Sequence, residues 1–328
     1  MAEAITKKRN TVLDFAKGLT ILLMLWEHLY PGNSWIMTFH MPLFFIISGY
    51  FLKEESFKTT VIKKAKGLLI PYFVMEFILI VSLVIYTAIQ NHYTLQGDKS
   101  WMWHIITVKL RGTFLVENMC ISWFVWVLFG GTCLYALINK LRKKLPVIYA
   151  MLIIACSIIG YVVSNDWGFY PYRWDVVLYV IPFIAIGHLY KLYGEELIQG
   201  YVRWILLGVS LVVWLVDIYF TDSYSIAMCH YEIYPLTLIG AICGTYVVIN
   251  ICSLLDRIPV LNTVIRWYGR NTLVIMCFAV VVSNAMEWYY ENDIKSAAIS
   301  FVIQLAIVSL LIAFWNSIKG IIKSLKKD

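Results

Sequence analysis

Charged residues are scarce in this sequence, at 14% of the 328 residues, while 61% are hydrophobic. Soluble domains are about 25% charged and about 45–50% apolar. A soluble fold could not bury so much apolar surface, so the composition excludes an ordinary soluble protein and indicates a chain embedded in lipid. The net charge of +7 does not indicate nucleic-acid binding, because the basic residues lie between long apolar runs, where orientation signals belong.

Cysteine motifs, internal repeats, low-complexity tracts and Gly-rich phosphate loops are also missing. The seven cysteines form no CxxC pair and no zinc-type spacing. Cys120 and Cys229 lie near the predicted outer face, where they could pair, and the others are expected to pack in the core. The core cysteines are Cys133, Cys156, Cys243, Cys252 and Cys277. We therefore predict a single domain over residues 1–328.

Long apolar runs dominate the chain. An apolar helix of about 20 residues crosses a bilayer core of about 30 Å. Ten runs have roughly this length, which predicts an all-α transmembrane helical bundle with ten spans. The predicted spans are 11–30, 35–52, 67–90, 119–139, 146–164, 174–190, 202–220, 232–254, 268–289 and 296–317.

The distribution of Lys and Arg predicts the orientation of these spans. If the N-terminus is inside, 21 of the 27 basic residues fall in inner segments and five in outer segments. Cytoplasmic segments carry the excess of Lys and Arg in membrane proteins. We therefore predict a multi-pass protein of the cell membrane with both termini in the cytoplasm and its longest outer loop at 91–118.

The first predicted span carries ionisable residues on one face. Lys17 and His28 are separated by a rotation of about 1100°, which is within about 20° of the same face, and by a rise of about 16 Å. Asp14 lies one turn before Lys17, where an ion pair can form. Ionisable groups within a membrane are costly and indicate function. This stripe is therefore expected to face the bundle interior.

A second histidine opens the next span. Pro42 fits the first turn of a helix, which puts His40 at the outer rim, near His28 across a turn containing Pro31 and Gly32. Two histidines could bind a metal, but no third ligand follows at a suitable spacing, so we predict no metal. A histidine acting as a general base is favoured. Glu27 points about 100° away from His28 and is not expected to orient it.

These residues occur in an ordered pattern along the chain. Lys17 and His28 are followed by Phe39-His40-Met41-Pro42-Leu43-Phe44-Phe45 and Ser48-Gly49-Tyr50, then Trp123-Phe124, Pro182-Phe183 with Gly187, and Gly269-Arg270-Asn271-Thr272-Leu273. The ordered set resembles the signature of the membrane acyltransferase-3 family, in the branch related to fucose 4-O-acetylases. Members of that family O-acylate sugars and cell-envelope polysaccharides. They usually carry arginine at the position of Lys17.

The resemblance implies an enzyme that transfers an acetyl group from acetyl-CoA, or another acyl-CoA, to a hydroxyl of a glycan or lipid-linked saccharide. The implied catalytic residues are His28 and His40, and the residues that support the site are Asp14, Ser48, Tyr50 and Trp123. The implied donor-binding residues are Lys17, Arg142, Arg266, Arg270 and Asn271, with Lys63, Lys64 and Lys66 as further candidates. The expected partners are acyl-CoA, the glycan acceptor and the lipid bilayer, and no nucleic acid.

Other interpretations of the same residues stay open. The inner basic residues could serve only to set the topology, and Asn271 could cap a helix rather than support an oxyanion. A polysaccharide or small-molecule exporter would also place charges inside the membrane. A third possibility is a membrane sensor domain that belongs to a larger enzyme.

Overall fold

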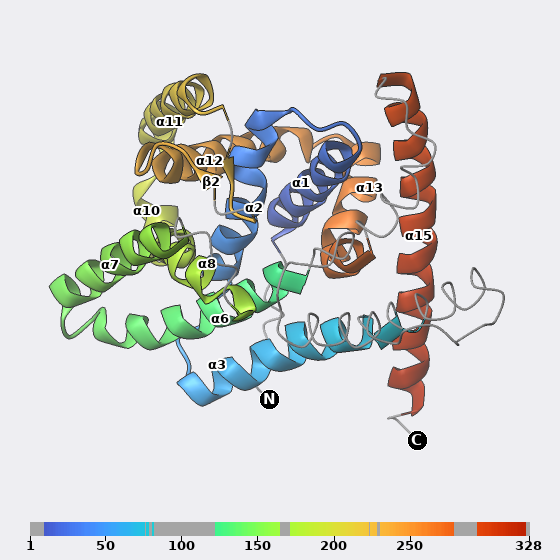
Figure 1. The fold of residues 1–328 in the computed structure, drawn as a ribbon, viewed down its shortest axis with the longest axis horizontal. Helices are drawn as coiled ribbons and strands as arrows, with labels where there is room; N and C mark the ends of the chain where they lie inside the picture. Colours follow the sequence, from blue (N-terminus) through green and yellow to red (C-terminus); the bar gives the residue numbers. More distant parts are fainter. Residues whose placement is uncertain are drawn as a thin grey trace, which may run out of the picture.

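Helices make up almost all of the computed structural model, which describes residues 10–75, 77–78, 81, 122–164, 171–222, 224–227, 230–278 and 294–325 (Figure 1). The long helices are α1 (Thr11–Leu29), α2 (Ser34–Tyr50), α6 (Ser122–Ile138), α7 (Pro146–Ser164), α11 (Gly200–Phe220), α12 (Leu236–Leu255), α13 (Pro259–Arg270) and α15 (Ile294–Leu325). The shorter helices are α3 (Phe57–Lys64), α8 (Trp174–Tyr179), α9 (Ile181–Leu189) and α10 (Glu195–Leu197).

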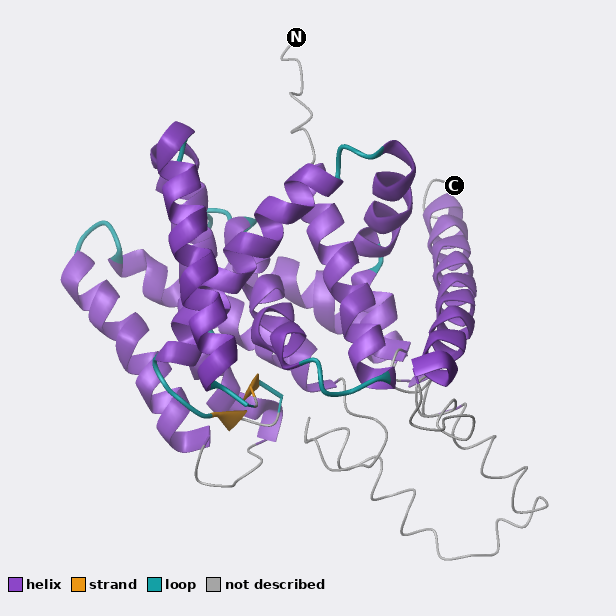
Figure 2. Ribbon diagram, turned by 90° about the horizontal axis from the view of Figure 1, so that it is seen from above, coloured by secondary structure: helices purple, strands orange, loops and turns teal. Residues whose placement is uncertain are grey.

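Tighter and wider helical turns extend several of these helices. The π-helical turn η1 (Ala65–Leu69) follows α3, and the π-helical turn η4 (Tyr190–Gly194) follows α9. The 3₁₀ turn η2 (Asn139–Leu141) follows α6, and the 3₁₀ turn η3 (Pro171–Arg173) precedes α8. Two short antiparallel strands, β1 (Tyr224–Ser225) and β2 (His230–Tyr231), form a hairpin at one end of the bundle (Figure 2).

Six helical segments are long and apolar enough to cross a membrane: 123–141, 146–164, 174–197, 200–220, 236–255 and 294–321. They confirm six of the predicted apolar spans. The runs at 11–30 and 35–52 are helical as predicted, but α2 has only 17 residues and α1 carries three charged residues, Asp14, Lys17 and Glu27. The runs at 67–90 and 268–289 lie partly outside the described residues. Ten spans and the orientation of the termini therefore stay predictions.

The exposed surface of α11 has the pattern of a helix that faces lipid. Tyr201 and Trp204 are 76% and 63% exposed near one end, and Tyr219 and Phe220 are 81% and 59% exposed near the other. The two aromatic pairs lie about 22–28 Å apart along the axis, close to the thickness of a hydrocarbon core. Aromatic side chains gather at the two membrane interfaces. This spacing supports a membrane-spanning position for α11.

Glycines allow two pairs of helices to touch through their backbones. A Cβ at Gly18 would lie 1.9 Å from the Ile265 carbonyl oxygen, and one at Gly269 would lie 1.8 Å from the Asp14 carbonyl oxygen. Helix α1 therefore packs directly on α13 (Figure 1). In the same way, Gly49 faces the Ile184 carbonyl and joins α2 to α9. Small residues at such crossings are typical of helix packing in membranes.

A buried ion pair holds the β1–β2 hairpin against α8. The Arg173 and Asp175 side chains are fully buried, with Arg173 Nη2 at 3.1 Å from Asp175 Oδ2. Arg173 Nη1 also donates to the Ala227 carbonyl at 2.7 Å, in the hairpin turn. These partners compensate the cost of burying the guanidinium, and removing one of them would leave an uncompensated buried charge.

The five cysteines that were expected to pack in the core lie within helices. Cys252 and Cys277 are buried, and Cys133, Cys156 and Cys243 are partly buried. The possible partners Cys120 and Cys229, and the predicted outer loop 91–118, lie outside the described residues.

The predicted orientation can be tested by cysteine labelling in a variant whose native cysteines are replaced. A single cysteine placed in the 91–118 loop should react with a membrane-impermeant maleimide added to intact cells. A cysteine at Lys143, which follows η2 on the predicted cytoplasmic side, should react only after permeabilisation. The reverse pattern would overturn the orientation that the charge distribution predicts.

Candidate active site

The N-terminal end of α1 holds a cluster of one carboxylate and two cations. Asn10 begins the helix, because its Oδ1 accepts the Leu13 N–H at 3.2 Å. Asp14 is therefore in the first turn, and it is buried. Lys17 Nζ lies 2.9 Å from Asp14 Oδ1, which confirms the predicted ion pair. Arg270 Nε approaches the other carboxylate oxygen, Oδ2, at 3.6 Å.

The glycine contacts between α1 and α13 explain how Arg270 reaches Asp14. Gly269 lies against the backbone of Asp14 itself, so the next residue of α13 must lie beside the start of α1. Arg270 keeps 48% of its side chain exposed and Lys17 keeps 19%. Both cations therefore remain accessible to an anionic ligand while they share one buried carboxylate.

The other two predicted donor-binding residues of this region are engaged within the protein. Arg266 makes a bidentate contact with Asp256, with both N–O distances at 2.6 Å. Asn271 ends α13, its Nδ2 donates to the Trp267 carbonyl at 2.8 Å, and its Oδ1 accepts from Asn316 of α15 at 3.3 Å. These contacts give Arg266 a partner in the loop before α13. They place Asn271 at the C-terminal end of α13, in contact with α15.

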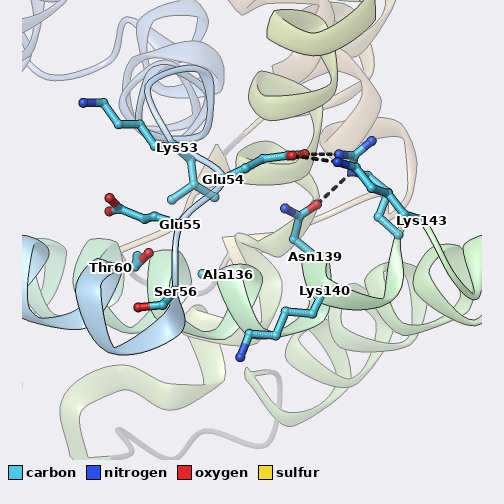
Figure 3. Close-up of a pocket in the computed structure, with 11 residues that line it drawn as sticks. Lys53, Glu54, Glu55, Ser56, Thr60, Ala136, Asn139, Lys140 and Lys143 are labelled. Atoms are coloured by element: carbon cyan, nitrogen blue, oxygen red, sulfur yellow. Dashed lines mark hydrogen bonds and ion pairs between the residues drawn. The ribbon is translucent and has the colours of Figure 1, made fainter.

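Arg142 belongs to a second cluster, at the end of α6. Its Nε donates to Asn139 Oδ1 at 3.0 Å, its Nη1 donates to the Tyr193 hydroxyl, and its Nη2 pairs with Glu54. Lys143 Nζ lies 2.8 Å from the second Glu54 oxygen. A cavity of about 390 Å³ between η2, the α2–α3 loop and α3 is bordered by Glu54, Asn139, Arg142 and Lys143 (Figure 3).

The two histidines lie at the far end of α1 from Asp14 and in the first half of α2. His40 is 7% exposed, and its Nδ1 lies 3.0 Å from the Ile36 carbonyl oxygen. A carbonyl only accepts, so Nδ1 carries the proton and the neutral ring keeps its basic lone pair on Nε2. His28 is exposed, and it is close enough to act electrostatically on His40, as the turn between the two helices predicts.

Glu27 stabilises the turn between the two histidines. Its Oε1 accepts the Gly32 N–H at 3.1 Å, at a residue whose φ of 111° favours glycine. This contact agrees with the prediction that Glu27 points away from His28. It also fixes the end of α1 relative to the beginning of α2, and therefore one imidazole relative to the other.

The predicted support residues join helices to one another. Ser48 Oγ lies 3.0 Å from Lys64 Nζ and 3.2 Å from Thr132 Oγ1, which links α2 to α3 and α6. The Tyr50 hydroxyl donates to Glu195 and accepts from Asn10 Nδ2 at 3.3 Å. Trp123 is buried and packs edge-on against Phe124 in the core.

Two polar features of the bundle had no signal in the sequence. Glu54 is the shared partner of Arg142 and Lys143. Tyr135 connects Tyr149 and His188 Nδ1, with both distances at 2.9 Å, in a buried network drawn from α6, α7 and α9. Neither could be found from local spacing, because the partners come from different helices. Among the described residues, no three His, Cys, Asp or Glu side chains are placed to hold a metal ion.

The two ends of helix α1 therefore lie in chemically different surroundings. Lys17 and Arg270 offer positive charge at one end, and His28 and His40 offer imidazoles at the other, about 16 Å along the axis. The cations can bind anionic groups, and a neutral imidazole can accept a proton from a hydroxyl.

Comparison with known proteins gives this arrangement a family. The sequence model of a protein family described as "acyltransferase domain" matches residues 10–317. The nodulation protein NolL of Sinorhizobium fredii is 27% identical over 214 residues, which cover 57% of this chain and 50% of that protein. The matched region thus spans about half the length of this relative. No solved structure was found to match the chain. Since the family model covers nearly the whole sequence, the protein belongs to the acyltransferase-3 family and carries its acyltransferase domain.

Proposed function

We propose that the protein is a membrane O-acyltransferase of the cell membrane. It moves an acetyl group from cytoplasmic acetyl-CoA to a hydroxyl of an envelope glycan, exopolysaccharide or lipid-linked saccharide at the outer face. Membership of the acyltransferase-3 family supports the reaction class. The observation that carries the proposal is the single helix α1, which has the Lys17–Asp14 pair near one end and His28 at the other.

The donor fits the end of α1 that carries the cations. Acyl-CoA has several phosphates at one end of a long flexible arm and a thioester at the other. Arg142, Lys17 and Arg270 could bind anionic or polar groups of the donor on the cytoplasmic side. The pantetheine arm would then carry the thioester along α1 toward the histidines. The separation of about 16 Å between Lys17 and His28 suits a donor held at one end and reacting at the other.

The acceptor fits the histidine end. His28 lies at the end of α1 opposite to the cations, where a hydroxyl that arrives from the predicted outer face would meet its ring. The hydroxyl oxygen attacks the thioester carbonyl, the C–S bond breaks, and the hydroxyl proton passes to His28 while CoA leaves as the thiolate. His40 positions the acceptor beside it, since its own Nδ1 is held by Ile36 and its ring cannot turn freely.

Lys17 is expected to contribute to donor affinity. Lys17→Ala should raise the KM for acetyl-CoA about tenfold or more, because a hydrogen bond to a charged group contributes about 1.5–3 kcal/mol. Lys17→Arg should keep a KM near that of the wild type, since the cation is retained. Steady-state kinetics on the purified variants measure both values. An unchanged KM in the alanine variant would leave Lys17 with only its structural pairing to Asp14.

The proposed reaction can be tested in the organism by mass spectrometry of its envelope glycans. Strains with and without the gene should differ by the mass of one acetyl group for each modified sugar. A catalytically dead variant should resemble the deletion strain. Identical glycan masses together with reduced glycan export would contradict acyl transfer and favour an exporter.

A further inference from the structure

Glu54 lies among basic residues that line the cavity between η2, the α2–α3 loop and α3. Its two carboxylate oxygens are divided between two cations, with one paired to Arg142 Nη2 and the other 2.8 Å from Lys143 Nζ (Figure 3). A phosphate group would bind the same two cations, because arginine and lysine side chains recognise phosphate and carboxylate oxygens in similar ways.

Arg142 is held in place independently of Glu54. Asn139 accepts from its Nε and the Tyr193 hydroxyl accepts from its Nη1, so only Nη2 is directed to Glu54. Its side chain is 8% exposed. The guanidinium therefore stays oriented toward the cavity when its carboxylate partner leaves, which is what a binding group needs.

Glu54 has the properties of an exchangeable partner. It lies between α2 and α3 in the loop 51–56, and its side chain is 42% exposed. Hydrogen bonding to Lys143 and the nearby charge of Arg142 hold the pKa of Glu54 below its ordinary value, so the carboxylate is ionised at neutral pH. The pair with Lys143 is exposed on both sides, and such pairs are typically worth only about 0.2–1 kcal/mol, while the Glu54 end of the pair with Arg142 is also open to solvent, so a stronger anion can replace this carboxylate.

The cavity wall remains positive after such an exchange. Lys53, Lys140, Arg142 and Lys143 line it, with Glu54 and Glu55 as its acidic residues. Glu55 is paired with Lys63 instead, on α3. If Glu54 moved away, Arg142 and Lys143 would face the cavity together without a carboxylate between them.

We propose that Glu54 is a built-in counter-anion of a phosphate-binding site, and that phosphate groups of the acyl donor displace it from Arg142 and Lys143 when they enter the cavity. This inference rests on the proposed function for the identity of the donor. It adds a regulatory element, because every binding event must compete with a carboxylate of the protein itself. The same chemistry would also accept the phosphate of an anionic lipid headgroup.

The test compares Glu54→Gln with Glu55→Gln in the full-length protein. Binding of adenosine 3′,5′-bisphosphate and of CoA is measured by calorimetry in nanodiscs of phosphatidylcholine. Glu54→Gln should bind both ligands about two- to tenfold more tightly than the wild type, since its carboxylate no longer competes for Arg142 and Lys143. Glu55→Gln should raise either affinity less than Glu54→Gln does, because Glu55 lines the same cavity but contacts neither Arg142 nor Lys143. Arg142→Ala should weaken binding about tenfold or more.

The outcomes separate this inference from the proposed function. Unchanged or weaker binding by Glu54→Gln, in a protein whose wild type transfers acetyl groups, would overturn the counter-anion role alone. A wild type that neither binds CoA nor transfers acetyl groups would overturn the proposed function. Repeating the measurement with phosphatidylglycerol in the nanodiscs distinguishes the source of the phosphate. If Glu54→Gln still binds adenosine 3′,5′-bisphosphate and CoA more tightly than the wild type in phosphatidylglycerol, the donor assignment is supported. If that difference disappears in phosphatidylglycerol, the site belongs to lipid headgroups and the donor assignment is overturned.

Discussion

His28→Ala should lower the rate of acetyl transfer by about 10²–10⁴-fold, the loss expected when a general base is removed. His28 is the exposed imidazole at the acceptor end of α1, and the hydroxyl proton would then have no nearby acceptor. The rate is measured with purified protein, labelled acetyl-CoA and an envelope glycan fragment. The Tm of the variant, compared with that of the wild type, shows whether the loss of rate reflects the chemistry or a folding defect.

His40→Ala is the matched comparison for this prediction. The His40 ring is buried and held by the Ile36 carbonyl, so it is expected to position the acceptor rather than take its proton. Its loss of rate should be smaller, with a larger share of the effect in the KM for the glycan. A wild-type rate in His28→Ala would remove that residue from catalysis. A greater loss in His40→Ala would transfer the role of base to His40 Nε2.

Gly269→Ala should destabilise the protein by about 1–3 kcal/mol or more, the usual cost of overpacking. The new methyl group would lie 1.8 Å from the Asp14 carbonyl oxygen, and this backbone atom of α1 cannot rotate away as a side chain could. Helices α1 and α13 would have to separate, which would move Arg270 away from Asp14. We therefore expect a lower Tm together with weaker donor binding.

Gly208→Ala provides the control, because Gly208 lies in α11 with nothing within 4 Å of the added Cβ. Both substitutions replace a helical glycine, and alanine alone should stabilise a helix by about 0.5–1 kcal/mol. The Tm of Gly208→Ala should therefore stay the same or rise. An equal Tm for both variants would mean that the contact between α1 and α13 is not tight in the membrane.

Features governed by local geometry could be predicted from the sequence. The pairing of Lys17 with Asp14 follows from helical spacing, and the proximity of His28 to His40 follows from a short turn between two helices. The apolar run at 146–164 coincides with α7 because Pro146 begins the helix and no charged residue interrupts it. In each case the determining residues lie close together in the chain.

Features that depend on contacts between distant segments could not be predicted. Arg270 reaches Asp14 only because Gly18 and Gly269 let two backbones touch. The bidentate pairing of Arg266 with Asp256 depends on how the chain turns between α12 and α13, which helical spacing alone does not give. The pairing of Glu54 in the loop 51–56 with Arg142 after η2 also joins distant segments, and nothing in the sequence around Glu54 indicates it.

The most direct test of acyl transfer uses the wild-type protein reconstituted in liposomes. Labelled acetyl-CoA is supplied on the side of the Lys-rich and Arg-rich segments, and a glycan fragment on the other side. We expect the label to appear on the glycan as an ester, and His28→Ala to abolish its appearance. Movement of unmodified glycan across the liposome membrane, with no labelled ester formed by the wild type, would contradict the acyltransferase function and identify a transporter instead.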